Sequence, residues 1–209
     1  RVASGHAGER LSVRGKSGPE PRQRARQSEL ALDVTNKTRS MALSGRGIRK
    51  TFVRDNSEVV LALDDVSLQV HSGTLAALVG PDGAGKTTLI RLAAGLLPFD
   101  EGELQVLGIS VSTDAQQVQD RIGYMPQKFG LYEDLSVQEN LDLYADLHGI
   151  SIKDRQEVYP RLMDMTALGP FTKRLAGQLS GGMKQKLGLP CTLVSRPELL
   201  LLDEPTVGV

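Results

Sequence analysis

A glycine-rich segment at positions 80 to 88 holds the residues best suited to chemistry. The phosphate-binding pattern G-x-x-x-x-G-K-S/T is matched there by Gly80, Gly85, Lys86 and Thr87. The glycines let backbone N–H groups turn inward around a phosphate, and the lysine reaches the β and γ phosphates. The threonine hydroxyl is a ligand for Mg²⁺. The predicted phosphate loop consists of Gly80, Pro81, Asp82, Gly83, Ala84, Gly85, Lys86, Thr87 and Thr88.

Two later clusters also carry groups that suit phosphate chemistry. Ser180, Gly181 and Gly182 precede a helical pattern, and such a helix start is a second anion site, although the same residues alone also read as a plain helix cap. Asp203 and Glu204 follow the apolar run 199–202. An acidic pair at the carboxyl end of a buried strand suits holding Mg²⁺ and activating a water molecule.

Two single residues have weaker signals. Phe52 precedes the phosphate loop in a hairpin-like setting, where it either stacks on a purine ring or belongs to the core. Gln127 follows a strand end and is placed to touch a nucleotide or its metal, because ligand contacts in open α/β sheets come from loops beyond strand ends. Without the other motifs, a glutamine in a surface loop would be the favoured interpretation of Gln127.

Strands and one helix must position the phosphate loop. Residues 75–79 predict a buried strand, and Leu89, Ile90, Leu92 and Ala93 predict the inner face of the helix that starts near Gly85. Upstream, the apolar patterns predict an antiparallel β layer of three strands, with polar turns between them, at 48–53, 59–63 and 66–70.

The rest of the chain alternates strands with helices. Short strands are expected at 103–107 and 121–125, with a polar helix over about 113–120 between them. Residues 128–178 change character and predict a helical insert. Its two apolar faces follow the spacing of Val137, Leu141, Tyr144, Ala145 and Leu147, then of Val158, Leu162, Met165 and Leu168.

Composition bounds the class of protein. At 209 residues, with 40% hydrophobic and 24% charged residues and a net charge of zero, the chain has an ordinary soluble globular composition. Its single cysteine excludes an internal disulfide and suits a reducing compartment. No apolar run approaches the ~18 residues of a membrane span, and no signal peptide is recognisable. We therefore expect a cytosolic protein that meets a membrane only through a partner.

The first forty residues stand apart from this pattern. They hold nine Lys and Arg against four Asp and Glu, with no aromatic residue and no sustained periodicity. Such composition predicts a disordered extension, native or artefactual. A basic tail is also a candidate for nucleic acid or anionic lipid, but no aromatics are interleaved for stacking, which favours a solvated extension.

The order of these features resembles the nucleotide-binding domain of ABC ATPases. Over residues 43–209 it runs from an aromatic strand residue through the phosphate loop, a glutamine, a helical insert and Leu-Ser-Gly-Gly-Met-Lys-Gln to a strand that ends in Asp-Glu-Pro. More narrowly, residues 122–135 are similar to ATPase subunits of ABC-2-type exporters. The resemblance implies an α/β P-loop NTPase with a RecA-like core, an antiparallel β layer and a helical insert. Its domains would be an extension at 1–41 and a nucleotide-binding domain at 42–209, with a helical subdomain at 128–178.

The resemblance also implies roles for single residues toward ATP and Mg²⁺. Phe52 would stack on adenine, and residues 80–88 would wrap the phosphates. Asp203 would support Mg²⁺ through water, and Glu204 would be the general base that polarises the attacking water. Catalysis is thus expected of Glu204, Gln127 and Lys86, and metal binding of Thr87, Gln127 and Asp203.

Partners follow from the same resemblance. Ser180, Gly181 and Gly182 would close over the nucleotide of a facing subunit, so that two sites form in a head-to-tail dimer with a second ABC ATPase domain, in tandem or as a homodimer. The expected function is to bind and hydrolyse ATP and so power an ABC-2-type exporter through its permease subunits, at the inner face of the plasma membrane. No nucleic acid partner is expected. The alternative is a soluble ABC ATPase acting on ribosomes or nucleic acid, although the insert of about fifty residues has transporter size. A binding module without turnover is disfavoured by Glu204.

Three departures from the family pattern are visible. The chain stops before the family's switch histidine, and none of His6, His71 and His148 is in its place, so a C-terminally truncated and poorly active fragment is expected. Asp82 replaces a commoner asparagine, with little expected effect because the backbone surrounds the phosphate. Pro190 falls inside the helix that Ser180 opens, where it should kink the helix or cost about 3 kcal/mol.

Overall fold

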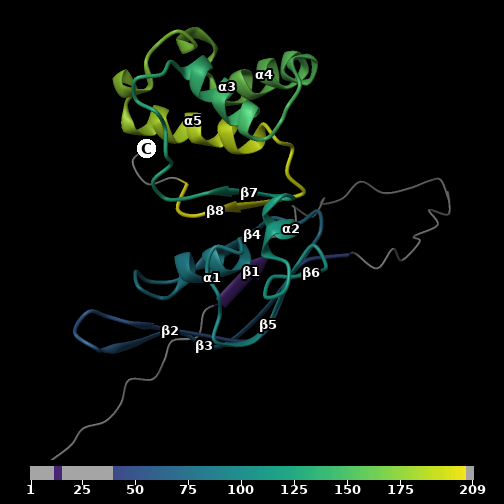
Figure 1. The fold of residues 1–209 in the computed structure, drawn as a ribbon, viewed down its shortest axis with the longest axis vertical. Helices are drawn as coiled ribbons and strands as arrows, with labels where there is room; N and C mark the ends of the chain where they lie inside the picture. Colours follow the sequence, from purple (N-terminus) through teal and green to yellow (C-terminus); the bar gives the residue numbers. More distant parts are fainter. Residues whose placement is uncertain (1–11, 16–39, 206–209) are drawn as a thin grey trace, which may run out of the picture. The chain divides into compact units, whose positions relative to one another are not determined.

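The structure is a computed structural model that describes residues 12–15 and 40–205 (Figure 1). These residues form two units. The strand unit comprises the described residues up to Lys86 together with Phe99–Ser110, and the helical unit comprises Thr87–Pro98 and the described residues from Val111 onward. No helix in the described ranges is long and apolar enough to cross a membrane.

An antiparallel sheet of order β3-β2-β5-β6 forms the larger part of the strand unit. Its strands are β2 (Met41–Val53), β3 (Val59–His71), β5 (Glu101–Val106) and β6 (Ile109–Ser110). Alternate residues point to one face and build the core of this unit, whose most buried side chains are Ile48, Leu63, Leu104 and Val106. The antiparallel β layer predicted from the sequence is therefore confirmed.

The predicted turn between residues 63 and 66 is wrong. The structure has one continuous strand, β3, with a bulge at Asp64-Asp65. Ile48 pairs with Val66 and Lys50 with Leu63, so β3 carries one residue more than β2 in this interval. A bulge absorbs the extra residue without ending the strand, and Asp65 takes a φ of 50° to do so.

The strand that leads into the phosphate loop, β4 (Ala76–Val79), is not buried as predicted. Leu75 is 87% exposed and Val79 63% exposed. The described partner of β4 is β1 (Ser12–Gly15), which pairs with it antiparallel, and a ribbon of two four-residue strands covers neither of its faces.

Strand β1 also corrects the expectation that the whole N-terminal extension lacks regular structure. The reason is the free edge of β4, which offers unpaired backbone groups to any extended segment in reach. The other residues of the predicted extension up to 39 lie outside the described residues, as do 206–209.

A parallel pair, β7 (Ile122–Met125) and β8 (Leu199–Leu202), lies in the helical unit. The pair begins at a double hydrogen bond from Arg121 to Glu198, at 2.6 and 2.7 Å, and Asp203 N–H donates to the Met125 carbonyl just past its end. The helices α1 (Lys86–Ala93) and α2 (Ala115–Gln119) precede β7 in the chain, as predicted.

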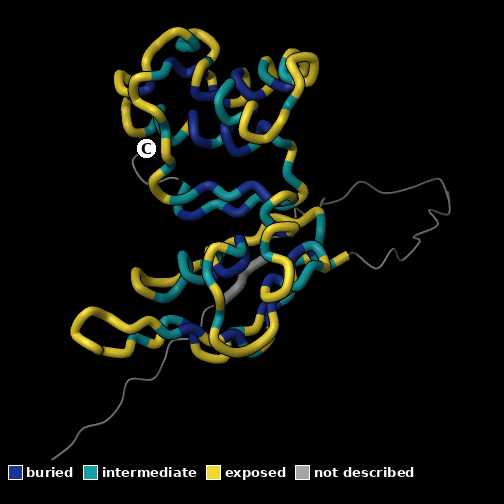
Figure 2. The backbone as a smooth tube through the Cα atoms, viewed as in Figure 1, coloured by how far each residue is buried: buried dark blue, intermediate teal, exposed yellow. Residues whose placement is uncertain are grey.

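Three longer helices complete the helical unit: α3 (Val137–Leu147), α4 (Ile152–Thr166) and α5 (Gly181–Leu193) (Figure 1). Two short 3₁₀ turns, η1 (Gly169–Phe171) and η2 (Ala176–Gln178), precede α5. Ser136 caps α3 in a capping box with Glu139, and Ser180 caps α5. Helices α3 and α4 pack on α5 around a core that includes Leu141, Leu162 and Leu187 (Figure 2). The helices predicted within residues 128–178 are confirmed, but Leu147, predicted on the inner face of α3, is 71% exposed.

Prolines lie inside two of these helices. Pro190 lies inside α5, which continues to Leu193, and Pro160, which carried no prediction, lies inside α4. The expected kink or energetic cost at Pro190 stays a prediction. Each proline leaves one carbonyl a turn earlier without its helical N–H partner. In α5 the neighbouring side chains Leu187 and Cys191 are fully buried. The predicted inner face of α4 also needs correction, because Met165 is 55% exposed and Met163 is buried in its place.

Candidate functional site

The phosphate loop joins β4 to α1, as the sequence predicts. Gly83 and Gly85 both have positive φ angles, of 79° and 83°, which residues with a side chain rarely adopt. A Cβ atom at Gly85 would lie 2.5 Å from the carbonyl oxygen of Ala62 on β3. The loop therefore needs glycine at this position both for its backbone conformation and for its close approach to the sheet.

Lys86 turns its side chain back onto the loop. Its Nζ atom donates hydrogen bonds to the carbonyl oxygens of Gly80, at 2.9 Å, and Pro81, at 2.8 Å. These two bonds hold the ammonium group against the backbone that is predicted to surround a phosphate. A bound anion would accept stronger, charge-assisted hydrogen bonds from the same ammonium group than these carbonyl oxygens do.

Thr87 and Asp203, which are far apart in the sequence, meet in the helical unit. Thr87 Oγ1 donates to Asp203 Oδ1 at 2.8 Å. The Asp203 side chain is buried, and its Oδ2 atom has no hydrogen-bond partner. A hydroxyl beside a buried carboxylate oxygen without a partner is a donor set that fits Mg²⁺, which prefers oxygen ligands. The residues present therefore fit the metal that the resemblance implied.

Gln127 and Glu204 also meet in the helical unit. The Gln127 side-chain amide donates from Nε2 to Glu204 Oε2 at 2.8 Å. Gln127 lies in the exposed segment after β7, and Glu204 follows β8 with a φ of 50°. Because β7 and β8 are parallel neighbours, their carboxyl ends bring these two residues to the same edge. The sequence predicted a role for each residue but not this contact.

Ser180, Gly181 and Gly182 lie at the N-terminus of α5. The Ser180 hydroxyl accepts a hydrogen bond from the Met183 N–H at 3.3 Å, as an N-cap does. Ser180 and Gly181 are exposed. The positive end of the helix dipole is therefore presented on the surface of the helical unit.

Phe52 lies near the end of β2, opposite Val60 on β3, with 37% of its surface exposed. The Lys50 Nζ atom lies 5.4 Å from the centre of its ring. Phe52 is therefore not a core residue. Its role in stacking on a purine ring stays a prediction.

Asp100 anchors the strand that carries Phe52, a contact that sequence reasoning missed. Its carboxylate accepts hydrogen bonds from Thr51 Oγ1 at 2.7 Å, from Lys50 Nζ at 2.9 Å and from the Thr51 N–H at 2.6 Å. These bonds lower the pKa of Asp100 to about 2, from an ordinary value of 3.8. No local sequence pattern could have revealed these hydrogen bonds, because the partners lie 49 or 50 residues apart in the chain.

Acid should therefore weaken the strand unit partly through Asp100. A lowered pKa in the folded state means that the stabilisation is complete above the unfolded pKa near 3.8 and is lost as pH falls toward about 2. We expect Asp100→Asn to show a smaller drop in thermal unfolding midpoint between about pH 5 and about pH 3 than the unchanged protein shows. Asp55→Asn, in the exposed turn after β2, is the matched control and should behave like the unchanged protein. An equal drop in both variants would contradict this assignment.

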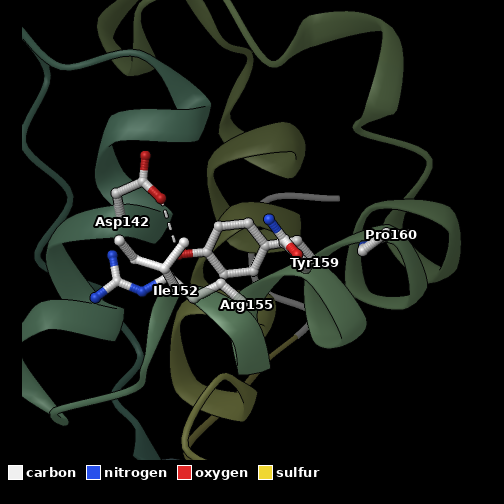
Figure 3. Close-up of a pocket in the computed structure, with 6 residues that line it drawn as sticks. Asp142, Ile152, Arg155, Tyr159 and Pro160 are labelled. Atoms are coloured by element: carbon white, nitrogen blue, oxygen red, sulfur yellow. Dashed lines mark hydrogen bonds between the residues drawn. The ribbon is translucent and has the colours of Figure 1, made fainter.

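A groove of about 570 Å³ lies between α3 and α4 and was not predicted (Figure 3). The hydroxyl of Tyr159 donates to Asp142 Oδ1 at 2.9 Å across it. Burial and the neighbouring carboxylate both raise the pKa of Tyr159. The residues that line the groove are Asp142, Ile152, Arg155, Gln156, Tyr159 and Pro160, none of which belongs to the predicted site.

The sequence matches the profile of the family described as ABC transporter over residues 63–207. It is 55% identical, over 163 residues, to the probable multidrug ABC transporter ATP-binding protein YbhF of Escherichia coli, covering 78% of this chain and 28% of that protein. It is 36% identical, over 183 residues, to the Nod factor export ATP-binding protein I of Sinorhizobium fredii, covering 88% and 49%. The chain thus spans half or less of the length of these two relatives.

Solved structures agree with the fold. A dimeric ATP-binding cassette in a post-hydrolysis state, bound to ADP and Pi, matches with a TM-score of 0.70 and 26% identity, over 80% of this chain and 75% of that one. The ATP-binding subunit of an ABC transporter matches with a TM-score of 0.67 and 26% identity, over 80% of this chain and 68% of that one. The α/β P-loop fold class predicted from the sequence is therefore confirmed.

Proposed function

The chain belongs to the ABC transporter family, and from this premise we propose that it is the ATP-binding and ATP-hydrolysing part of a membrane exporter. The observation that carries the proposal is the meeting of two pairs at the ends of β7 and β8. Thr87 donates a hydrogen bond to Asp203, and Gln127 donates a hydrogen bond to Glu204. Oxygen ligands for a metal and a carboxylate for proton transfer are the groups that phosphoryl transfer to water needs.

Residues 80–88 bind the phosphates of ATP in this proposal. Backbone N–H groups of the loop and the Lys86 ammonium hold the β and γ phosphates, and Phe52 stacks on the adenine ring. Thr87 and Asp203 would hold Mg²⁺, with Gln127 as a further ligand. When bound, Mg²⁺ neutralises the charge that develops on the phosphate oxygens.

Glu204 acts as the general base. The Gln127 amide occupies Oε2 and so orients the carboxylate, which leaves Oε1 to accept a proton from the attacking water. Lys86 stabilises the negative charge on the β and γ phosphate oxygens as the bond from the γ phosphorus to the ADP leaving group breaks. The phosphate loop surrounds only one side of the γ phosphate, so each site needs further donors from a second domain. In a head-to-tail dimer, Ser180, Gly181 and Gly182 of this chain supply those donors to the nucleotide of the facing ATPase domain.

The intact protein works, in this proposal, with the permease subunits of an ABC-2-type exporter at the cytoplasmic face of the membrane. The names of the multidrug and Nod factor relatives support export. Dimer closure would carry the energy of hydrolysis to the permease. The solved dimer of a related cassette supports the dimeric arrangement.

Affinity purification of the intact protein from solubilised membranes tests the partner. We expect a membrane permease to co-purify, and the permease should remain bound to Lys86→Ala, because that change lies in the nucleotide loop. Mass spectrometry identifies the companion. Recovery of ribosomal proteins or nucleic acid in place of a permease would favour the soluble class of ABC ATPases and overturn the exporter proposal.

A further inference from the structure

Gln127 is held from two sides. Its side-chain amide donates to Glu204, and its backbone oxygen accepts a hydrogen bond from Nε2 of Gln185 at 2.9 Å. Gln185 lies in the second turn of α5, the helix that begins after Ser180. One residue therefore connects the carboxylate proposed as general base with the helix that carries the second anion site.

Two neighbouring contacts fasten the same segment to the same helix. Lys184 Nζ pairs with Glu133 Oε1 at 2.6 Å. One turn further along α5, Gly188 has no side chain, and a Cβ there would lie 2.9 Å from Cγ of Phe129. The absence of a side chain lets the phenylalanine ring lie directly on the helix. Residues 127–133 and the first half of α5 are therefore joined at three successive points.

The Gln185 amide is only half satisfied. Its Nε2 atom makes the bond to Gln127, but its Oε1 atom is buried without a hydrogen-bond partner. A buried acceptor without a donor costs free energy, and this cost offsets what the Nε2 bond contributes. Stability alone is therefore a poor reason for an amide at this position. An apolar side chain of the same length would fill the space without leaving an acceptor unpaired.

We propose that Gln185 is a positioning residue for Gln127. The inference rests on the proposed ATPase function. The hydrogen bond from Gln185 holds the Gln127 backbone in the position from which the Gln127 side chain reaches Glu204.

Gln185→Met in the intact protein tests the proposal. Methionine keeps the length of the side chain and removes both amide groups. We expect kcat for ATP hydrolysis to fall about tenfold with KM changed less than about twofold, because the phosphate loop is untouched. The thermal unfolding midpoint should move by less than about 3 °C. Lys186→Met, on the exposed side of the same helix, is the matched control and should retain the unchanged kcat.

A double-mutant cycle separates positioning from a merely structural role. Gln127→Ala keeps the backbone oxygen that Gln185 bonds but removes the side chain through which Gln185 is proposed to act. In this background Gln185→Met should change the single-turnover hydrolysis rate by less than about twofold. A tenfold loss in both backgrounds, or no loss in either, would overturn the proposal. So would a tenfold loss that comes with a large fall in the unfolding midpoint.

The two proposals fail in distinguishable ways. If the intact unchanged protein does not hydrolyse Mg-ATP, or if Lys86→Ala hydrolyses it equally well, the proposed function is wrong. The proposed role of Gln185 is then wrong too. If turnover is present and depends on Lys86 but Gln185→Met matches Lys186→Met, only the positioning role is refuted.

Discussion

Lys86→Ala in the intact protein should lower the rate of ATP hydrolysis by a factor on the order of 10²–10³ and weaken ATP binding severely. The Lys86 ammonium already lies against the loop backbone, bonded to the carbonyl oxygens of Gly80 and Pro81. Alanine removes the positive charge that is proposed to meet the β and γ phosphates, and the phosphate-binding pattern occurs at one place in the sequence. Loss of a preorganised charge at a site of phosphoryl transfer costs on the order of 10²–10³ in rate.

Binding of a fluorescent ATP analogue and steady-state phosphate release measure the two effects. Lys173→Ala, an exposed lysine outside the proposed site, is the matched control and should leave both unchanged. Turnover by Lys86→Ala at the rate of the unchanged protein would refute the assignment of residues 80–88 as the phosphate loop.

Glu204→Gln should bind ATP normally and hydrolyse it about 10²–10⁴ times more slowly. Glutamine keeps the shape of the side chain and an oxygen that can accept the Gln127 hydrogen bond, but it cannot take a proton from water. Because binding is kept while turnover is blocked, the ATP-bound dimer should persist long enough to be isolated.

Single-turnover hydrolysis measures the rate, and size-exclusion chromatography with Mg-ATP measures the dimer. Glu103→Gln removes one surface carboxylate at an exposed position of β5 and is the control, which should hydrolyse ATP at the unchanged rate. Normal hydrolysis by Glu204→Gln would mean that Glu204 has a structural role and that the base lies elsewhere.

Features set by neighbouring residues were predictable from the sequence. Gly83 and Gly85 are glycines because the loop backbone turns through positive φ angles, and Ser180 caps α5 with its own side chain. Such local rules survive in any tertiary setting. The helical insert was also predictable, because amphipathic spacing over more than ten residues leaves little choice of structure.

Features set by distant partners were not predictable in the same way. The exposure of β4 depends on which strands pair with it, and the apolar residues 75–79 alone could not reveal that. The bulge at Asp64-Asp65 exists because β2 runs past it without a break. The Gln127–Glu204 contact needs β7 and β8 to be neighbours, a fact of topology that no local pattern contains.

Cys191 lies in the core of the helical unit, and this makes the chain convenient for site-specific labelling. It is fully buried, and its desolvation raises its thiol pKa to about 12. Thiolates, and not protonated thiols, attack maleimides and disulfide reagents, so near neutral pH this sole cysteine of the chain should react far more slowly than an exposed one. A cysteine introduced at an exposed position such as Lys186 could therefore carry a spin label or fluorophore without prior removal of the native thiol. Distances between two such labels would then report movement of α5 directly.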